Sequence, residues 1–175
     1  MQELWEKCVA FHGHACPGLA IGFRAAEAAR VWLGMVGFSK DEELVCVTEN
    51  DACGVDAIQV LLGCSFGKGN LIFKDRGKQA FSFFDRKNAK EGRVVFNRPL
   101  NQNLDRQQMQ AYILSAPLDE LFELKKPQFV LPQKARLFVS KECEICGERA
   151  AEHKMRFQNE KVVCLDCFTA YSREL

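Results

Sequence analysis

The chain has 175 residues, 47% of them hydrophobic, and its 24 Lys and Arg nearly balance its 23 Asp and Glu to give a formal charge of +1. This composition excludes a disordered chain, and the near-neutral charge provides no overall field for binding nucleic acid or an acidic membrane. The sequence has no apolar run of the about 18 residues that span a membrane and no signal-peptide pattern, so we expect a cytoplasmic protein without membrane contact.

Helical and strand patterns alternate over the first 140 residues. Apolar residues recur at helical spacing in five segments, where we predict helices: residues 2–10, 17–35, 55–62, 104–115 and 117–124. Runs of β-branched and aromatic residues predict strands in five segments: residues 44–48, 71–74, 79–84, 93–97 and 135–139. Turn residues between the second, third and fourth strands indicate an antiparallel meander. Small residues along the segment 17–35 indicate close packing against another element.

Soft metal ligands are concentrated just before the helix predicted from Pro17. His12, His14 and Cys16 are each separated by one residue. Imidazole nitrogen and thiolate sulfur suit zinc, copper or iron, and a thiolate at a helix N-terminus is stabilised by the helix dipole. We therefore predict a metal site or a nucleophile here, against the alternative of a buried cysteine beside two hydrogen-bonded histidines.

A polar turn after the predicted strand 44–48 offers partners for this stretch. The turn contains Glu49, Asp51 and Cys53, and Asp56 follows in the first turn of the next predicted helix. Turns between a strand and a helix commonly carry ligands and catalytic groups. Cys53 is thus the best candidate for a further ligand.

The next turn, residues 63–70, is rich in glycine and contains Cys64 and Lys68. A phosphate-binding P-loop is excluded, because Leu62 stands where that loop needs glycine and Gly69 where it needs Ser or Thr. The turn either binds a small anion through backbone N–H groups and the lysine, or is simply a tight turn.

Two Cys-x2-Cys pairs lie near the C-terminus: Cys143, Cys146, Cys164 and Cys167. Four thiolates at this spacing predict a tetrahedral structural zinc site, and zinc would supply much of the folding free energy of so short a segment. A hairpin within residues 154–163 and a helix over residues 165–173 would complete a treble-clef-like finger. We place the domain boundary near Ser140, which gives domains 1–140 and 141–175.

The charge of the finger argues against nucleic-acid binding. Residues 141–175 contain six Lys or Arg and seven Asp or Glu. A DNA-binding finger normally carries a basic surface. We interpret the finger as a structural or protein-contact module.

Together these motifs resemble the FmdE family of formylmethanofuran dehydrogenase subunits over essentially the whole chain. The resemblance is carried by four features: Phe11-His12-Gly13-His14-x-Cys16-Pro17-Gly18, Cys53-x2-Asp56-Ala57-Ile58-Gln59, Gly63-Cys64-Ser65-x-Gly67-Lys68-Gly69-Asn70 and the four-cysteine finger. It implies an α+β domain, thioredoxin-like in outline, with a mixed β-sheet flanked by helices and a metal-binding active site. It also implies a treble-clef zinc finger and association with a molybdenum- or tungsten-dependent formylmethanofuran dehydrogenase.

We hypothesise a cytoplasmic metalloprotein of anaerobic one-carbon or redox metabolism. The first site would bind a second metal, expected to be zinc, through His14, Cys16 and Cys53, with His12 and Cys64 as alternates. An open position on that metal would activate water or polarise a carbonyl. The candidate catalytic residues are the thiols Cys16 and Cys53, the proton carriers Glu49 and Asp56, and the anion contact Lys68.

Two other classes of function compete with this hypothesis. The chain could be a non-catalytic adaptor that docks on an oxidoreductase, or dimerises, through its finger. It could also be a thiol redox protein that uses Cys16, Cys53 and Cys64, although residues 1–140 contain no Cys-x-x-Cys motif. We also expect a homodimer.

Overall fold

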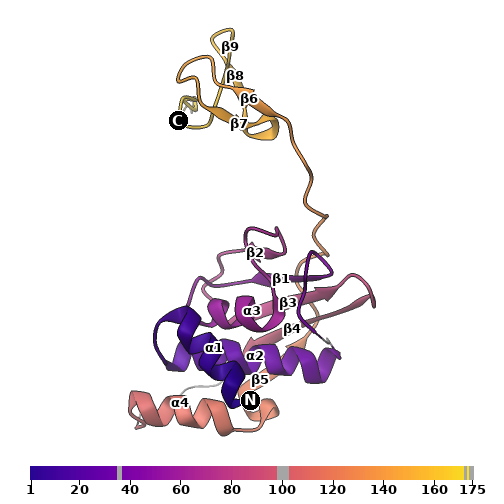
Figure 1. The fold of residues 1–175 in the computed structure, drawn as a ribbon, viewed down its shortest axis with the longest axis vertical. Coiled ribbons are helices and arrows are strands. Elements are labelled where there is room, and N and C mark those ends of the chain that lie inside the picture. The colour runs from indigo at the N-terminus through magenta and orange to yellow at the C-terminus, as the bar shows by residue number, and fades with distance from the viewer. Residues whose placement is uncertain (35–36, 98–102, 172, 174–175) are drawn as a thin grey trace. The chain divides into compact units, whose positions relative to one another are not determined.

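The protein is described by a computed structural model that covers residues 1–34, 37–97, 103–171 and 173. The chain divides into two compact units, Met1–Ala135 and Arg136–Leu175 (Figure 1). None of the described helices is both long and apolar enough to cross a membrane.

The helices of the first unit follow the predicted pattern closely up to α4. They are α1 (Gln2–His12), α2 (Pro17–Leu33), α3 (Gly54–Leu62), α4 (Arg106–Ser115) and α5 (Leu118–Leu121). Pro17 occupies the first position of α2, where its missing N–H costs nothing, and Gly34 ends the helix in the left-handed conformation at φ 59°. The predicted end of this helix at residue 35 lies outside the described residues.

A five-stranded mixed sheet forms the centre of the first unit. Its strands are β1 (Leu44–Thr48), β2 (Leu71–Phe73), β3 (Ala80–Asp85), β4 (Lys90–Phe96) and β5 (Phe122–Lys125), in the order β2-β1-β3-β4-β5. β1 and β2 are parallel, whereas β1, β3, β4 and β5 pair antiparallel. The mixed α+β fold implied by the resemblance is confirmed.

Three predicted elements are wrong, each because a distant contact decides the outcome. The strand 71–74 does not join a meander, since α3 carries the chain across between β1 and β2 and makes them parallel. The helix 117–124 ends at Leu121, because Phe122–Lys125 pairs with β4 and Phe122 packs edge-on against Phe96. Residues 135–139 form no strand, and the next strand starts at Ser140.

Both faces of the sheet are covered. One face packs its residues Cys46, Phe81 and Phe83 into the main core, which also contains apolar residues of α2 and α3. On the opposite face Val45, Val47 and Phe84 form a second cluster. Because successive residues of a strand point to opposite faces, the even-numbered residues of β1 face the helices and the odd-numbered ones face away.

The second unit contains two short hairpins. Its elements are β6 (Ser140–Glu142), β7 (Arg149–Ala151), the 3-10 helix η1 (Glu152–Lys154), β8 (Arg156–Gln158) and β9 (Lys161–Val163). The β8–β9 hairpin is as predicted. The helix predicted over residues 165–173 is wrong: residues 165–167 form a turn, and the described residues beyond it are not helical. The side chain of Gln158 explains this, since it bonds both the N–H and the C=O of Thr169, the groups a helix would use.

Candidate metal sites

The first cluster lies at the junction of α1 and α2. The ligand atoms of His12, His14 and Cys16 all lie within 4.8 Å of one another. The sequence folds this way because Gly13 ends α1 at φ 91° and reverses the chain, and Cys16 then caps α2. The imidazole rings of His12 and His14 are 4.6 Å apart between centroids. Two imidazoles and one thiol in this arrangement are a donor set that zinc accepts.

Asp56 orients one of these imidazoles. The Nδ1 atom of His12 lies 2.7 Å from Oδ2 of Asp56, while Gln59 donates a hydrogen bond of 3.2 Å to Oδ1 of the same carboxylate. Nε2 of His12 is thereby left facing Cys16, whose Sγ is 3.9 Å away. A histidine that binds a metal usually has its other nitrogen held by a carboxylate in this way. His12, an alternate in the sequence-based set, therefore has the strongest geometric support.

The thiols of Cys16 and Cys53 meet at the start of two helices. Cys16 caps α2 and accepts a hydrogen bond of 3.3 Å from the N–H of Leu19, and Cys53 stands at the cap position of α3. A Cβ atom added at Gly18 would lie 3.5 Å from Sγ of Cys53 and 3.9 Å from Sγ of Cys16. Burial, followed by a hydrogen bond with Cys16, raises the pKa of the Cys53 thiol. The bare backbone at Gly18 thus leaves room for the two sulfurs side by side.

Glycine also lets the two helices cross at this point. A Cβ atom at Gly22 of α2 would lie 2.0 Å from the carbonyl oxygen of Gly54, the first residue of α3. No real Cβ contact is that short, so only glycine fits. The small residues of this helix were visible in the sequence, but their partner was not.

Glu49 lies on the other face of the sheet. It continues the odd-numbered side of β1, and the guanidinium of Arg93 binds both of its carboxylate oxygens at 2.5 and 2.9 Å. Both side chains are buried, at 0% and 5% exposure. A carboxylate fixed in a bidentate, buried ion pair serves the fold, so we leave Glu49 out of the proposed site and correct its expected role as a proton carrier.

Cys64 and Lys68 lie beyond the opposite end of α3 from Cys53. That helix has nine residues, so about 13 Å of helix separates its two ends. Cys64 is fully buried with its thiol 3.7 Å from the carbonyl of Leu44, and burial raises its pKa to about 12. Lys68 donates to the carbonyl of Ser39 at 2.7 Å. The structure does not bring either residue to the His and Cys cluster.

We expect Asp56→Ala to weaken metal binding at the first site by about 10-fold to 100-fold, because His12 loses the carboxylate that fixes its ring. A competition titration of the full chain against a chelating dye measures this affinity. Asp51→Ala is the matched control, since it removes an exposed carboxylate from the neighbouring turn. Equal affinities in the two variants would show that Asp56 has no orienting role.

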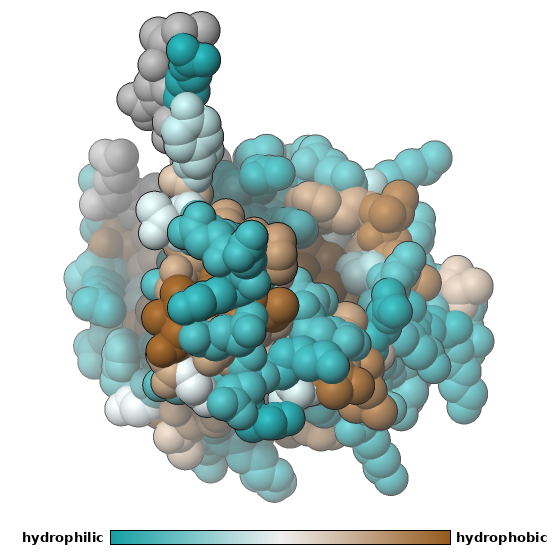
Figure 2. Space-filling model, turned by 90° about the horizontal axis from the view of Figure 1, so that it is seen from above, coloured by the Kyte–Doolittle hydropathy of each residue, from teal (hydrophilic) through white to brown (hydrophobic). Residues whose placement is uncertain are grey.

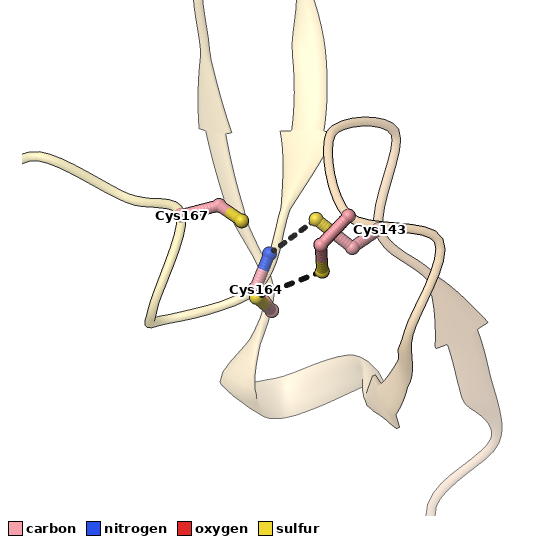
Figure 3. A group of neighbouring side chains, drawn as sticks. Cys143, Cys164 and Cys167 are labelled. Carbon is pink, nitrogen blue, oxygen red and sulfur yellow. Dashed lines mark hydrogen bonds between the residues drawn. The ribbon is translucent and has the colours of Figure 1, made fainter.

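The second cluster lies in the finger. The sulfurs of Cys143, Cys146, Cys164 and Cys167 all lie within 4.8 Å of one another, and the three labelled in Figure 3 point toward one another. The N–H of Cys164 donates to Sγ of Cys143 at 3.3 Å. Backbone hydrogen bonds, with that of Cys146 the strongest, lower the pKa of the Cys143 thiol to about 6. A thiol held this way is already prepared to bind zinc as the thiolate.

Fold and sites together define an α+β domain with a His and Cys metal cluster, followed by a four-cysteine zinc finger. Residues 11–123 match the family described as "FmdE, Molybdenum formylmethanofuran dehydrogenase operon". The chain belongs to the FmdE family, which confirms the resemblance seen in its sequence. Residues 138–173 match the "Prokaryotic dksA/traR C4-type zinc finger".

Two relatives cover most of this chain. The crystal structure of an FmdE-like protein of tungsten formylmethanofuran dehydrogenase, from Syntrophus aciditrophicus, is 25% identical, with a TM-score of 0.67 over 95% of this chain and 90% of that one. A "Probable S-adenosyl-L-methionine-binding protein" from Archaeoglobus fulgidus is 27% identical over 192 residues, which is 92% of this chain. The chain spans about half of that relative, namely 51%.

Proposed function

We propose that the first unit is a metal-binding domain and that the chain is a cytoplasmic metalloprotein of anaerobic one-carbon or redox metabolism. The observation that supports this most directly is the convergence of His12, His14 and Cys16, with His12 held by Asp56. A convergent pair of imidazoles and a thiol is more than a simple hydrogen-bonded cluster needs. Zinc suits this donor set.

The exposure of the cluster favours a working site over a purely structural one. Cys16 is buried, His12 is partly buried and His14 is exposed, so solvent reaches one side. Three protein ligands with an open fourth position are typical of catalytic zinc, which supplies a Lewis acid for water or a carbonyl. Within the chain, Asp56 fixes the His12 ring, and the α2 N–H groups near Leu19 stabilise the Cys16 thiolate.

Metal counting tests this proposal. Cys16→Ser should lower the metal content of chain purified without oxygen by about one ion, because a hydroxyl is a poor zinc ligand, while the finger stays loaded. Elemental analysis against protein concentration gives the number. Cys8→Ala, which changes a buried cysteine of α1 away from the cluster, should keep the full content. An unchanged stoichiometry in Cys16→Ser would rule the site out.

A second candidate function is an adaptor that docks on a molybdenum or tungsten formylmethanofuran dehydrogenase, or another oxidoreductase, through the finger. Ile145, Phe157 and Tyr171 of the second unit are exposed at 59%, 73% and 87%, more than a solvated module needs. Elsewhere hydrophilic residues predominate, and hydrophobic ones emerge in separate patches on the face drawn in Figure 2. Metal found only in the finger would favour this function, and we propose a homodimer in either case, to be checked by light scattering.

A further inference from the structure

The pair Cys16 and Cys53 has a chemistry of its own that metal binding does not use. Their side chains hydrogen-bond to each other, and both flank the space left by Gly18. Cys16 is also one of the three cluster residues, whereas Cys53 is not. One sulfur therefore has two alternative partners: a metal ion shared with two histidines, or a neighbouring thiol.

Exposure distinguishes Cys53 from the other cysteines of the first unit. Among those described there, Cys8, Cys16, Cys46 and Cys64 are buried, and only Cys53 is partly exposed. A small oxidant dissolved in water thus reaches Cys53 first. The thiol that Cys53 contacts, and so the one able to resolve an oxidised Cys53, is Cys16.

We propose that Cys16 and Cys53 form a reversible disulfide when no metal is bound, so that oxidation and metal loading compete for the Cys16 sulfur. The bridge itself follows from the placement of the two thiols. The competition rests on the proposed function, in which Cys16 is a metal ligand.

The oxidant is a hydroperoxide, which takes two electrons from the two thiols. The Cys53 sulfur attacks one oxygen of hydrogen peroxide, the O–O bond breaks, and a sulfenic acid and one water result. The Cys16 sulfur then attacks the Cys53 sulfur, the S–S bond forms, the S–O bond breaks, and the oxygen leaves as a second water with the Cys16 proton. A dithiol reverses the bridge by two exchanges.

The metal would protect the pair because a coordinated thiolate is no longer free to attack the sulfenic acid. In the other direction, a bridged Cys16 has no thiolate to donate. The His12 and His14 nitrogens alone then offer too few ligands for tight binding. Oxidation would in this way silence the first site while leaving the separate finger cysteines to their own zinc.

The test treats the full chain with hydrogen peroxide, once after a chelator and once after reloading with zinc. Fragmentation mass spectrometry locates any bridge, and free thiols are counted. We expect the chelated chain to lose about two thiols and about 2 Da from the first unit, with the bridge at Cys16 and Cys53, and the zinc-loaded chain to lose neither. Cys53→Ser should abolish the bridge, and Cys8→Ala should retain it.

The outcomes separate the two ideas. A bridge that forms equally with and without zinc supports the thiol pair and overturns Cys16 as a ligand. No bridge in the chelated chain, together with loss of one metal ion in Cys16→Ser, overturns the disulfide and leaves the metal site standing. A bridge from Cys53 to Cys46 or Cys64 also overturns the proposal, because it would show that another thiol resolves Cys53.

Discussion

Removal of zinc is expected to unfold residues 136–175 and to leave the first unit folded. The finger buries little apolar surface: its core is the cluster of Cys143, Val163 and Cys164 with a few partly buried neighbours. A segment of this size cannot offset its chain entropy by burial alone, whereas a structural zinc contributes about 10–16 kcal/mol. The loss of zinc therefore exceeds any stability the finger can have without it.

Separate probes for the two units make this experiment decisive. Both tryptophans of the chain, Trp5 and Trp32, lie in the first unit, so their fluorescence reports on that unit alone. Amide chemical-shift dispersion for residues 136–171 reports on the finger. A strong chelator, or Cys164→Ser, should collapse that dispersion while the tryptophan signal stays native. Dispersion that survives in Cys164→Ser would mean that the four thiols do not hold the fold.

The parts of this protein that the sequence predicted are those decided by neighbours along the chain. The limits of α1 and α3 follow from helical spacing and from Gly13 and Gly63, both of which adopt the left-handed conformation that ends a helix. The β8–β9 turn follows from Asn159 and its neighbour, which both adopt positive φ. The finger ligands come in two local pairs. In each case the deciding residues lie within a few positions of one another.

The parts that the sequence did not predict depend on contacts between distant segments. β5 exists because Phe122 pairs with Phe96 across the sheet. The helical pattern of the segment around Phe122 was outweighed by that pairing. Local spacing alone could not reveal either partner.

The candidate site shows the same division. The His and Cys stretch was evident from the sequence, but the role of Asp56 was not, because its partner His12 lies 44 residues earlier. The parity of β1 could have placed Glu49 on the far face, since Val45 and Val47 share its side. What parity could not supply was Arg93, which occupies both oxygens of that carboxylate.

Gly22→Ala is expected to destabilise the first unit by about 3 kcal/mol and to abolish metal binding at the first site. The added Cβ would stand 2.0 Å from a backbone oxygen and 2.4 Å from the Cα of Gly54. A backbone cannot move aside as a flexible side chain can, so α2 and α3 must separate. Because Cys16 and Cys53 stand at the starts of these two helices, separation also pulls the thiols apart.

Urea unfolding followed by tryptophan fluorescence measures this loss in the first unit without interference from the finger. Gly67→Ala is the matched control, because a Cβ there meets nothing within 4 Å and its φ is not positive. The control should stay within about 0.5 kcal/mol of the parent chain. If Gly22→Ala matched the control in stability but still lost its metal, the helix crossing would position the site without supporting the fold. If it matched the control in both, the close crossing of α2 and α3 would itself be disproved.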